Sequence, residues 1–219
     1  MGPTVLPRVK VCCIRDAQEA ALAVGLGAAA LGLVSAMPSG PGVITDAQVR
    51  AIAATVPPGV ASFLLTSRGD AALIVAQLRE ARVGVVQICD RLTRGGYADI
   101  RAALPNVKIV QVVHVTGAAS IDEALAAAGE VDAILLDSGN PALAVKELGG
   151  TGRRHDWSLS RAIRESAPVP VYLAGGLTPA NVREAVDTVS PFGLDVCSGV
   201  RTNGALDRAK LEAFIAARA

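Results

Sequence analysis

Residues 171–201 read VYLAGGLTPANVREAVDTVSPFGLDVCSGVR, and two apolar runs of strand length fall in and just before this segment. The first run, residues 169–174, ends at the pair Gly175-Gly176, and the second, residues 192–196, ends at Cys-Ser-Gly-Val. Between them, Thr178 suits the N-cap and Pro179 the first position of a helix over residues 179–189. The segment therefore predicts two consecutive βα units, each with glycine at the carboxyl end of its strand.

These two glycine loops predict a phosphate site. Glycine lets backbone N–H groups approach a ligand closely, and a following helix N-terminus adds partial positive charge. In (β/α)8 barrels the usual phosphate site follows strands 7 and 8. The glycines alone are also compatible with plain tight turns, but two such loops in succession favour phosphate binding by Gly175, Gly176, Ser198 and Gly199.

The same unit recurs along the whole chain. Continuous Val, Ile, Leu and Ala runs, typical of strands buried on both faces of a parallel sheet, occur at residues 9–13, 30–34, 61–65, 83–88, 107–113, 133–136, 169–174 and 193–196. Helical patterns alternate with them at residues 17–24, 46–54, 71–81, 98–104, 121–128, 159–165, 179–189 and 206–218. We therefore predict one TIM-barrel domain over residues 1–219, a (β/α)8 barrel of eight parallel strands, with residues 1–7 as a loose tail.

Composition excludes several classes of protein. Apolar residues make up 51% of the 219 residues and aromatic residues 3%, so the predicted core is aliphatic. A net charge of +1, without lysine or arginine runs, argues against a nucleic-acid or membrane surface. No apolar stretch suits a bilayer span, and the first ten residues lack the apolar core of a signal peptide. The four cysteines show neither zinc nor disulfide spacing, so we expect no metal and a cytoplasmic location.

Chemistry in a barrel stands at the carboxyl ends of its strands, where Cys12 and Cys13 follow strand 1. Side chains alternate along a strand, so one of the two is expected to face the barrel mouth and the other the helix layer. A phosphate site nearby would favour a thiolate that acts as a base or nucleophile. The alternative for each cysteine is a small buried hydrophobe.

Other candidate groups follow strands 5 and 6. Asp137 ends strand 6, where apolar surroundings suit a general acid, although a capping role is the alternative. His114 ends strand 5 as a possible proton carrier, with a packed histidine as the favoured alternative. Residues 149–157, GGTGRRHDW, form a glycine-rich loop long enough to close over a ligand.

Taken together, these motifs resemble the phosphoribosylanthranilate isomerase family of tryptophan biosynthesis over nearly the whole chain. Residues 10–15, KVCCIR, resemble the family's Lys-Ile-Cys-Gly-Ile-Thr/Arg, and residues 135–137, LLD, resemble its strand 6. Residues 149–157 are similar to its Gly-Gly-Thr-Gly…Phe-Asp-Trp motif. Residues 173–182, LAGGLTPANV, and 195–200, DVCSGV, resemble its phosphate loops.

The resemblance implies an Amadori rearrangement of N-(5'-phosphoribosyl)anthranilate, an aldose–ketose isomerisation, in a monomer or homodimer. The family's general acid matches Asp137, which would protonate the ring oxygen, and its general base matches Cys12, which would remove the C2′ proton. The implied substrate is a small phosphorylated sugar. No metal or organic cofactor is implied, because the substrate's own nitrogen serves as the electron sink.

The sequence departs from the family pattern where the anthranilate ring would bind. Residues 39–42 read Ser-Gly-Pro-Gly where the family has Ser-Pro-Arg, whose arginine faces the anthranilate carboxylate. Residues 87–90 read Gln-Ile-Cys-Asp in place of Gln-Leu-His-Gly, while Cys13 replaces a glycine and Arg201 a glutamate. Arg15 and Arg94 are the candidate replacements for the lost arginine. We expect the remaining substrate contacts from Gln87, Cys89, His114, Gly150, Thr151 and Gly152.

Two alternatives stay open at this point. One is a paralogue that uses the same acid and base on a different phosphorylated ribose derivative in specialised metabolism. The other is a non-catalytic barrel that binds a phosphorylated ligand or a partner protein. The retained Cys12 and Asp137 argue against the second alternative.

Overall fold

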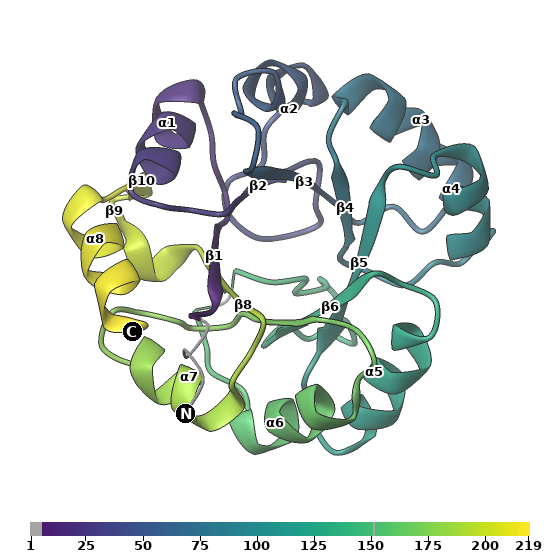
Figure 1. Cartoon of the computed structure of the whole chain (residues 1–219). Helices are drawn as coiled ribbons and strands as arrows, with labels where there is room; N and C mark the ends of the chain where they lie inside the picture. The colour runs from purple at the N-terminus through teal and green to yellow at the C-terminus, as the bar shows by residue number, and fades with distance from the viewer. Residues whose placement is uncertain (1–5, 151) are drawn as a thin grey trace.

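Eight parallel strands form a closed barrel in chain order, with β1 pairing with β8 to complete the ring (Figure 1). The structure is a computed structural model and describes residues 6–150 and 152–219. The strands are β1 (Arg8–Val11), β2 (Ala30–Val34), β3 (Ala61–Thr66), β4 (Val85–Ile88), β5 (Lys108–His114), β6 (Ala133–Asp137), β7 (Val171–Leu173) and β8 (Gly193–Val196). The predicted fold class is therefore confirmed. Most of the tail predicted over residues 1–7 lies outside the described residues.

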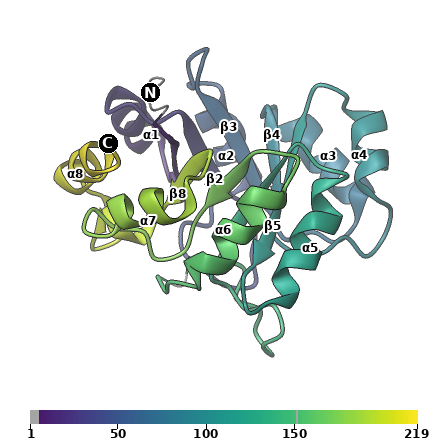
Figure 2. The same cartoon turned by 60° about the horizontal axis from the view of Figure 1, so that its bottom comes forward.

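The helices form an outer layer around the barrel, and Figure 2 shows α5, α6 and α7 in front of the strands. They are α1 (Ala17–Gly25), α2 (Asp46–Ala53), α3 (Ala71–Ala81), α4 (Tyr97–Ala103), α5 (Ala119–Ala128), α6 (Trp157–Ser166), α7 (Val182–Val189) and α8 (Arg208–Ala217). A short 3₁₀ helix, η1 (Ser198–Val200), and an antiparallel pair, β9 (Arg201–Thr202) and β10 (Ala205–Leu206), separate β8 from α8. None of the helices in the described part of the chain has the length and apolar character needed to cross a bilayer.

Side-chain oxygens define where most of these helices begin. Asp16, Asp70, Asp156 and Asp207 each accept a hydrogen bond from a backbone N–H in the first turn of the helix that follows. Thr45 forms a reciprocal capping box at α2. Each cap satisfies donors that have no partner within the helix and thereby ends the preceding βα loop at a defined residue.

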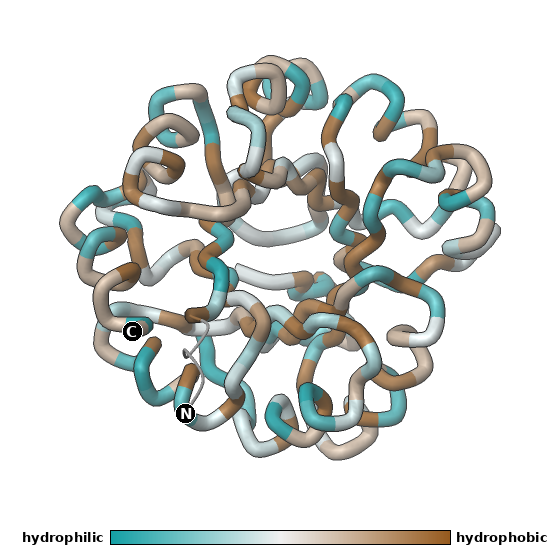
Figure 3. The backbone as a smooth tube through the Cα atoms, viewed as in Figure 1, coloured by the Kyte–Doolittle hydropathy of each residue, from teal (hydrophilic) through white to brown (hydrophobic). Residues whose placement is uncertain are grey.

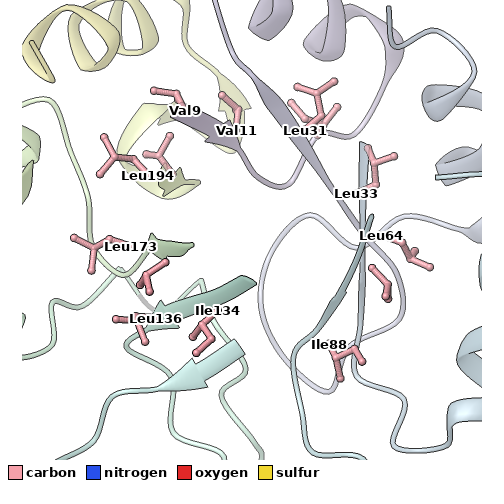
Figure 4. Close-up of a cluster of buried hydrophobic side chains, with 14 of the residues drawn as sticks. Val9, Val11, Leu31, Leu33, Leu64, Ile88, Ile134, Leu136, Leu173 and Leu194 are labelled. Carbon is pink, nitrogen blue, oxygen red and sulfur yellow. The ribbon is translucent and has the colours of Figure 1, made fainter. Parts of the chain in front are cut away.

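An aliphatic layer fills the space between the strands and the helices. Figure 3 shows the apolar segments along the strands, with more polar segments on the helices. Alternate strand residues point outward into this layer (Figure 4), among them Val9, Val11, Leu31, Leu33, Leu64, Ile88, Ile134, Leu136, Leu173 and Leu194. These side chains are almost completely buried, and each contributes roughly 1.5–3 kcal/mol of transfer free energy.

The inside of the barrel holds a buried ion pair. Lys10 and Asp195 are in register on β1 and β8, and Lys10 Nζ lies 2.9 Å from an Asp195 carboxylate oxygen. Lys10 is 0% exposed, and its ammonium also lies 5.3 Å from the centre of the Phe63 ring. Burial alone would lower the pKa of Lys10, but attraction to Asp195 holds it above its usual range. Burial raises the pKa of Asp195, and attraction to Lys10 opposes that rise. Each group thus favours the charged form of the other where β1 and β8 close the barrel.

The boundaries of two predicted elements are wrong for identifiable reasons. Thr178 does not cap α7: its N–H donates to Asn181 Oδ1 at 2.8 Å, and Asn181 Nδ2 donates to the Gly176 carbonyl at 2.9 Å. These bonds make a turn, so the helix begins at Val182. Strand β1 ends at Val11, not at Cys13, because Cys13 has the left-handed backbone conformation, with φ of 63°.

Candidate active site

A pocket opens at the carboxyl ends of the strands, where a barrel enzyme keeps its chemistry. Its wall comes from the loops that follow β1, β2, β4, β6, β7 and β8. Cys12 and Asp137, the predicted base and acid, both line it. Gln87, Cys89, Gly150, Gly152, Gly175, Gly176 and Ser198 line it as well. The structure thus brings together residues from the first to the last βα unit.

Cys12 and Cys13 both line the pocket, so the expectation that one would face the helix layer is wrong. Strict alternation holds only within a strand, and β1 has ended before these residues. Arg201 holds the turn: its Nη2 donates to the Cys13 carbonyl at 2.6 Å and to the Cys12 carbonyl at 3.1 Å. Its Nη1 lies 2.9 Å from Glu19 Oε1. From the sequence, Arg201 is only a departure from the family pattern, because the residues that it contacts lie far away along the chain.

Lys10 stands beside Cys12 in the barrel. A Cβ built on Gly32 would lie 2.9 Å from Cys12 Sγ and 3.1 Å from Lys10 Nζ, so the two atoms border the same small space. After the larger effects of burial and Asp195, attraction to Cys12 also contributes to the raised pKa of Lys10. The buried ammonium is thus the cationic group next to the Cys12 side chain. The alternation of side chains along β1 predicts that Lys10 lies inside the barrel, but it does not predict that Asp195 pairs with it.

Asp137 is nearly buried, and the glycine-rich loop lies directly against it. The Ser138 N–H donates to Asp137 Oδ1 at 2.7 Å. A Cβ built on Gly149 would lie 2.6 Å from Asp137 Oδ2, so the loop backbone packs at the carboxyl group without room for a side chain. Gly149 has φ of 127°, a conformation that favours glycine. The loop therefore packs against one side of Asp137, which also lines the pocket.

The loops after β7 and β8 contact each other at Gly199. Gly175 and Gly176 have φ of 83° and 63°, and both line the pocket beside Ser198. Gly199 does not line the pocket; instead it packs against the Leu177 carbonyl so closely that a side chain would overlap it. The loop after β8 contains the three-residue η1, and the helix predicted over residues 206–218 follows later, as α8. The two loops thus form one continuous wall of the pocket.

Several predicted substrate contacts lie elsewhere. Arg15 pairs with Glu19 at 3.0 Å, and Arg94, whose side chain is 83% exposed, pairs with Asp70 at 3.4 Å. Neither arginine lines the pocket, so both proposed replacements for the missing arginine are wrong: their loops point them along the outer helices. His114 is buried with its Nε2 3.1 Å from the Cys89 carbonyl and does not line the pocket either. Thr151 lies outside the described residues.

The loop between β6 and α6 spans the mouth of the barrel. Ser39 Oγ donates to the Lys146 carbonyl at 2.6 Å, and a Cβ on Gly150 would lie against the Pro41 ring. Lys146 Nζ lies 2.5 Å from Asp90 Oδ2, so the acidic group after β4 is paired with a cation from this loop. Sequence reasoning missed Lys146 because nothing in its own neighbourhood marks it as a mouth residue. Across residues 6–150 and 152–219, no three His, Cys, Asp or Glu side chains cluster as a metal site requires.

Comparisons with known proteins agree with this arrangement. The model of the family described as N-(5'-phosphoribosyl)anthranilate (PRA) isomerase matches residues 9–217. An N-(5'-phosphoribosyl)anthranilate isomerase of Halobacterium salinarum is 39% identical over 213 residues, covering 96% of this chain and 95% of the relative.

Solved structures of the same kind superpose over nearly the whole chain. The phosphoribosyl anthranilate isomerase of Thermotoga maritima is similar with a TM-score of 0.81 and 29% identity, over 97% of this chain and 98% of that one. A phosphoribosyl anthranilate isomerase in complex with reduced 1-(o-carboxyphenylamino)-1-deoxyribulose 5-phosphate is similar with a TM-score of 0.79 and 27% identity, over 97% and 98% of the two chains. The chain therefore belongs to the N-(5'-phosphoribosyl)anthranilate isomerase family.

Proposed function

We propose that this protein isomerises N-(5'-phosphoribosyl)anthranilate to 1-(o-carboxyphenylamino)-1-deoxyribulose 5-phosphate, with Asp137 as general acid and Cys12 as general base. The observation that supports this most directly is one pocket lined by Cys12, Asp137 and the glycine loops after β7 and β8, in a member of this family. We place the enzyme in the cytoplasm as a monomer or homodimer that has no nucleic-acid partner.

The reaction needs one proton delivered and one removed. Asp137 donates a proton to the furanose ring oxygen, the C1′–O bond breaks, and the nitrogen lone pair forms the iminium. The Cys12 thiolate then removes the C2′ proton, and the electron pair moves toward nitrogen to give an enolamine that tautomerises to the ketone. The Lys10 ammonium next to Cys12 stabilises the thiolate that this step consumes. The loop at Gly149 keeps water away from Asp137.

Replacing Gly176 by valine is expected to weaken substrate binding. Its φ of 63° disfavours a side chain, and a Cβ there would lie 2.8 Å from the carbonyl group of Arg153. The valine therefore displaces the backbone proposed to hold the phosphate, with a loss of about 2–3 kcal/mol, the size of one or two charge-assisted hydrogen bonds. KM for the substrate and the inhibition constant of inorganic phosphate should both rise on the order of 10²-fold.

Gly84→Val is the matched control, since a Cβ at Gly84 meets nothing within 4 Å and its position lies before β4. It should leave both constants unchanged. A phosphate or sulfate ion bound elsewhere in the barrel mouth, with the loops of Gly176 and Ser198 empty, would contradict the proposed cradle.

The pocket wall at residues 39–42 has no cation to bind the anthranilate carboxylate. Pro41→Arg is expected to raise kcat/KM for phosphoribosylanthranilate roughly 10–10²-fold, as one charge-assisted hydrogen bond contributes about 1.5–3 kcal/mol. Pro38→Arg adds the same charge on the same loop outside the pocket lining and should give little gain. Unchanged kcat/KM in Pro41→Arg, with the wild type already near 10⁵ M⁻¹s⁻¹, roughly the usual enzyme range, would mean that other residues bind the carboxylate.

The missing arginine also favours one second candidate, a paralogue that acts on a different phosphorylated ribose derivative. Neither Arg15 nor Arg94 lines the pocket, which leaves an anionic ring without an obvious partner among the lining residues. Complementation of a tryptophan auxotroph that lacks this isomerase separates the two. Growth supports the isomerase, and no growth, with soluble protein expressed, favours the paralogue.

A further inference from the structure

Two cysteine side chains meet at the mouth of the barrel outside the acid–base pair. Cys13 Sγ and Cys197 Sγ lie 2.7 Å apart, although the residues are 184 positions apart in sequence. Both thiols are free, and both line the pocket. Neither side chain has a part in the proposed isomerisation. Sulfur atoms this close need only small movements to form a covalent bond.

The surroundings hold the two thiols facing each other. The backbone of Cys13 is fixed by the Arg201 guanidinium on its carbonyl, and its Sγ approaches the Pro41 carbonyl at 3.6 Å. On its other side, Gly42 packs so closely that a Cβ there would overlap Cys13. Cys197 directly follows β8, and β8 is hydrogen-bonded to β1, the strand that precedes Cys13. The pair therefore lies across the seam at which the barrel closes.

The two thiols have different reactivities, as a disulfide-forming pair requires. Cys197 is the more exposed one. Its hydrogen bond with Cys13 lowers its pKa, and the positive charge of Arg201 acts in the same direction. Hydrogen bonds with Cys12 and Cys197 raise the pKa of Cys13. Cys197 is thus the nucleophile, and Cys13 is the thiol that attacks second.

We propose that Cys13 and Cys197 are a site of reversible oxidation by small-molecule disulfides, and that their bond stops turnover. The Cys197 thiolate attacks one sulfur of the compound RSSR, forming a Cys197–S–S–R mixed disulfide and releasing RS⁻. Cys13 then loses its proton to solvent and attacks Cys197 Sγ, releasing a second RS⁻. Two protein thiols are oxidised and one RSSR is reduced to two thiols.

The effect on turnover follows from the neighbours of the two residues, and it rests on the proposed function. Cys13 directly follows Cys12, the proposed base, and Cys197 directly precedes Ser198 of the proposed phosphate cradle. A disulfide has strict requirements for sulfur separation and torsion, so the bond constrains the backbone next to Cys12 and next to Ser198. A displacement of about 1 Å at a reacting group costs on the order of 10²-fold in rate.

Mass spectrometry of the oxidised full-length protein tests the proposal directly. The reduced protein is incubated with excess oxidised glutathione, alkylated, digested with trypsin and mapped without reductant. We expect peptide 11–15 linked to peptide 184–201 through Cys13, with two of the four thiols lost. Isomerase activity should fall on the order of 10²-fold and return with dithiothreitol.

Variants show which thiols take part. The activity of each oxidised variant is compared with the activity of the same variant in its reduced form. Cys197→Ser should form no linked peptide and keep its activity in oxidised glutathione. Cys13→Gly should also form no linked peptide, but it should stop at the mixed disulfide, with one glutathione on the peptide that carries Cys197. Cys89→Ser removes a thiol from the same pocket and should still form the linkage and lose activity. Cys89 itself is almost completely buried, with its Sγ 3.8 Å from Gln87 Nε2.

A missing linked peptide, a bond from Cys12 instead of Cys13, or equal inactivation of Cys197→Ser would overturn the proposal. A linkage that leaves turnover unchanged would overturn the part that concerns activity. The linkage is measured by mass whether or not the protein turns over phosphoribosylanthranilate. Failure of the proposed function, with the linkage present, is therefore distinguishable from failure of this inference.

Discussion

Asp137→Asn is expected to lower kcat by roughly 10²–10⁴-fold with a much smaller change in KM, the size of a lost general acid or base. The amide has nearly the same shape as the carboxyl group and keeps the contacts at Ser138 and Gly149, but it has no proton to deliver to the ring oxygen. Cys12→Ala should have an effect of the same order, since it removes the group that accepts the C2′ proton. Steady-state kinetics on phosphoribosylanthranilate provides the measurement.

Asp132→Asn is the control for the acid, because Asp132 precedes the same strand at the opposite end of the barrel and pairs with Arg101 and Lys108. Its kcat should stay close to that of the wild type. For the base, the comparison is within the cysteine pair. Full activity in Cys12→Ser together with loss of activity in Cys13→Ser would reverse the assignment. Both residues line the pocket, so either could reach the substrate.

Lys10→Met is expected to lower the free energy of unfolding by about 3–5 kcal/mol, the usual cost of breaking a buried ion pair from one side. Lys10 is 0% exposed, so the substitution leaves the carboxylate of Asp195 inside the barrel without its cation. Urea denaturation followed by circular dichroism measures the change. Adding Asp195→Asn to Lys10→Met should recover part of the loss, because no uncompensated charge then remains buried.

Lys108→Met is the matched control for this effect. Lys108 also pairs with an aspartate, Asp132, at 3.1 Å, but its side chain is 64% exposed. Exposed pairs contribute about 0–1 kcal/mol, so the two substitutions should differ by several-fold. A loss below about 1 kcal/mol for Lys10→Met would contradict the view that the substitution leaves an uncompensated charge buried in the barrel.

The barrel and its catalytic end were predictable because they rest on local patterns. Apolar runs of strand length alternate with helical patterns, and the carboxyl ends of parallel strands necessarily share one side of the barrel. The positions of Cys12, Asp137, Gly175 and Gly176 in the pocket follow from that topology alone. The missing arginine at residues 39–42 could also be recognised from the sequence, because the composition of a short loop does not depend on distant contacts.

What could not be predicted depends on backbone turns and on long-range pairing. The left-handed conformation of Cys13 reverses the expected direction of its side chain, and a residue other than glycine gives no sign of it in the sequence. Lys146 reaches Asp90 only because a loop crosses the barrel mouth. Arg15 and Arg94 were proposed from the loops they belong to, whereas their nearest carboxylates on the outer helices decided where they point.

The closure of the barrel between β1 and β8 also constrains how the chain is made. The first strand leaves the ribosome long before its partner, so β1 has an unpaired edge and Lys10 lacks its counter-ion until β8 has been synthesised. Nascent chains that stall before residue 193 therefore expose a sheet edge with a lone cation in an otherwise apolar interior. Contacts this distant in sequence slow folding, and the barrel can close only after β8, near the end of the chain, has been synthesised.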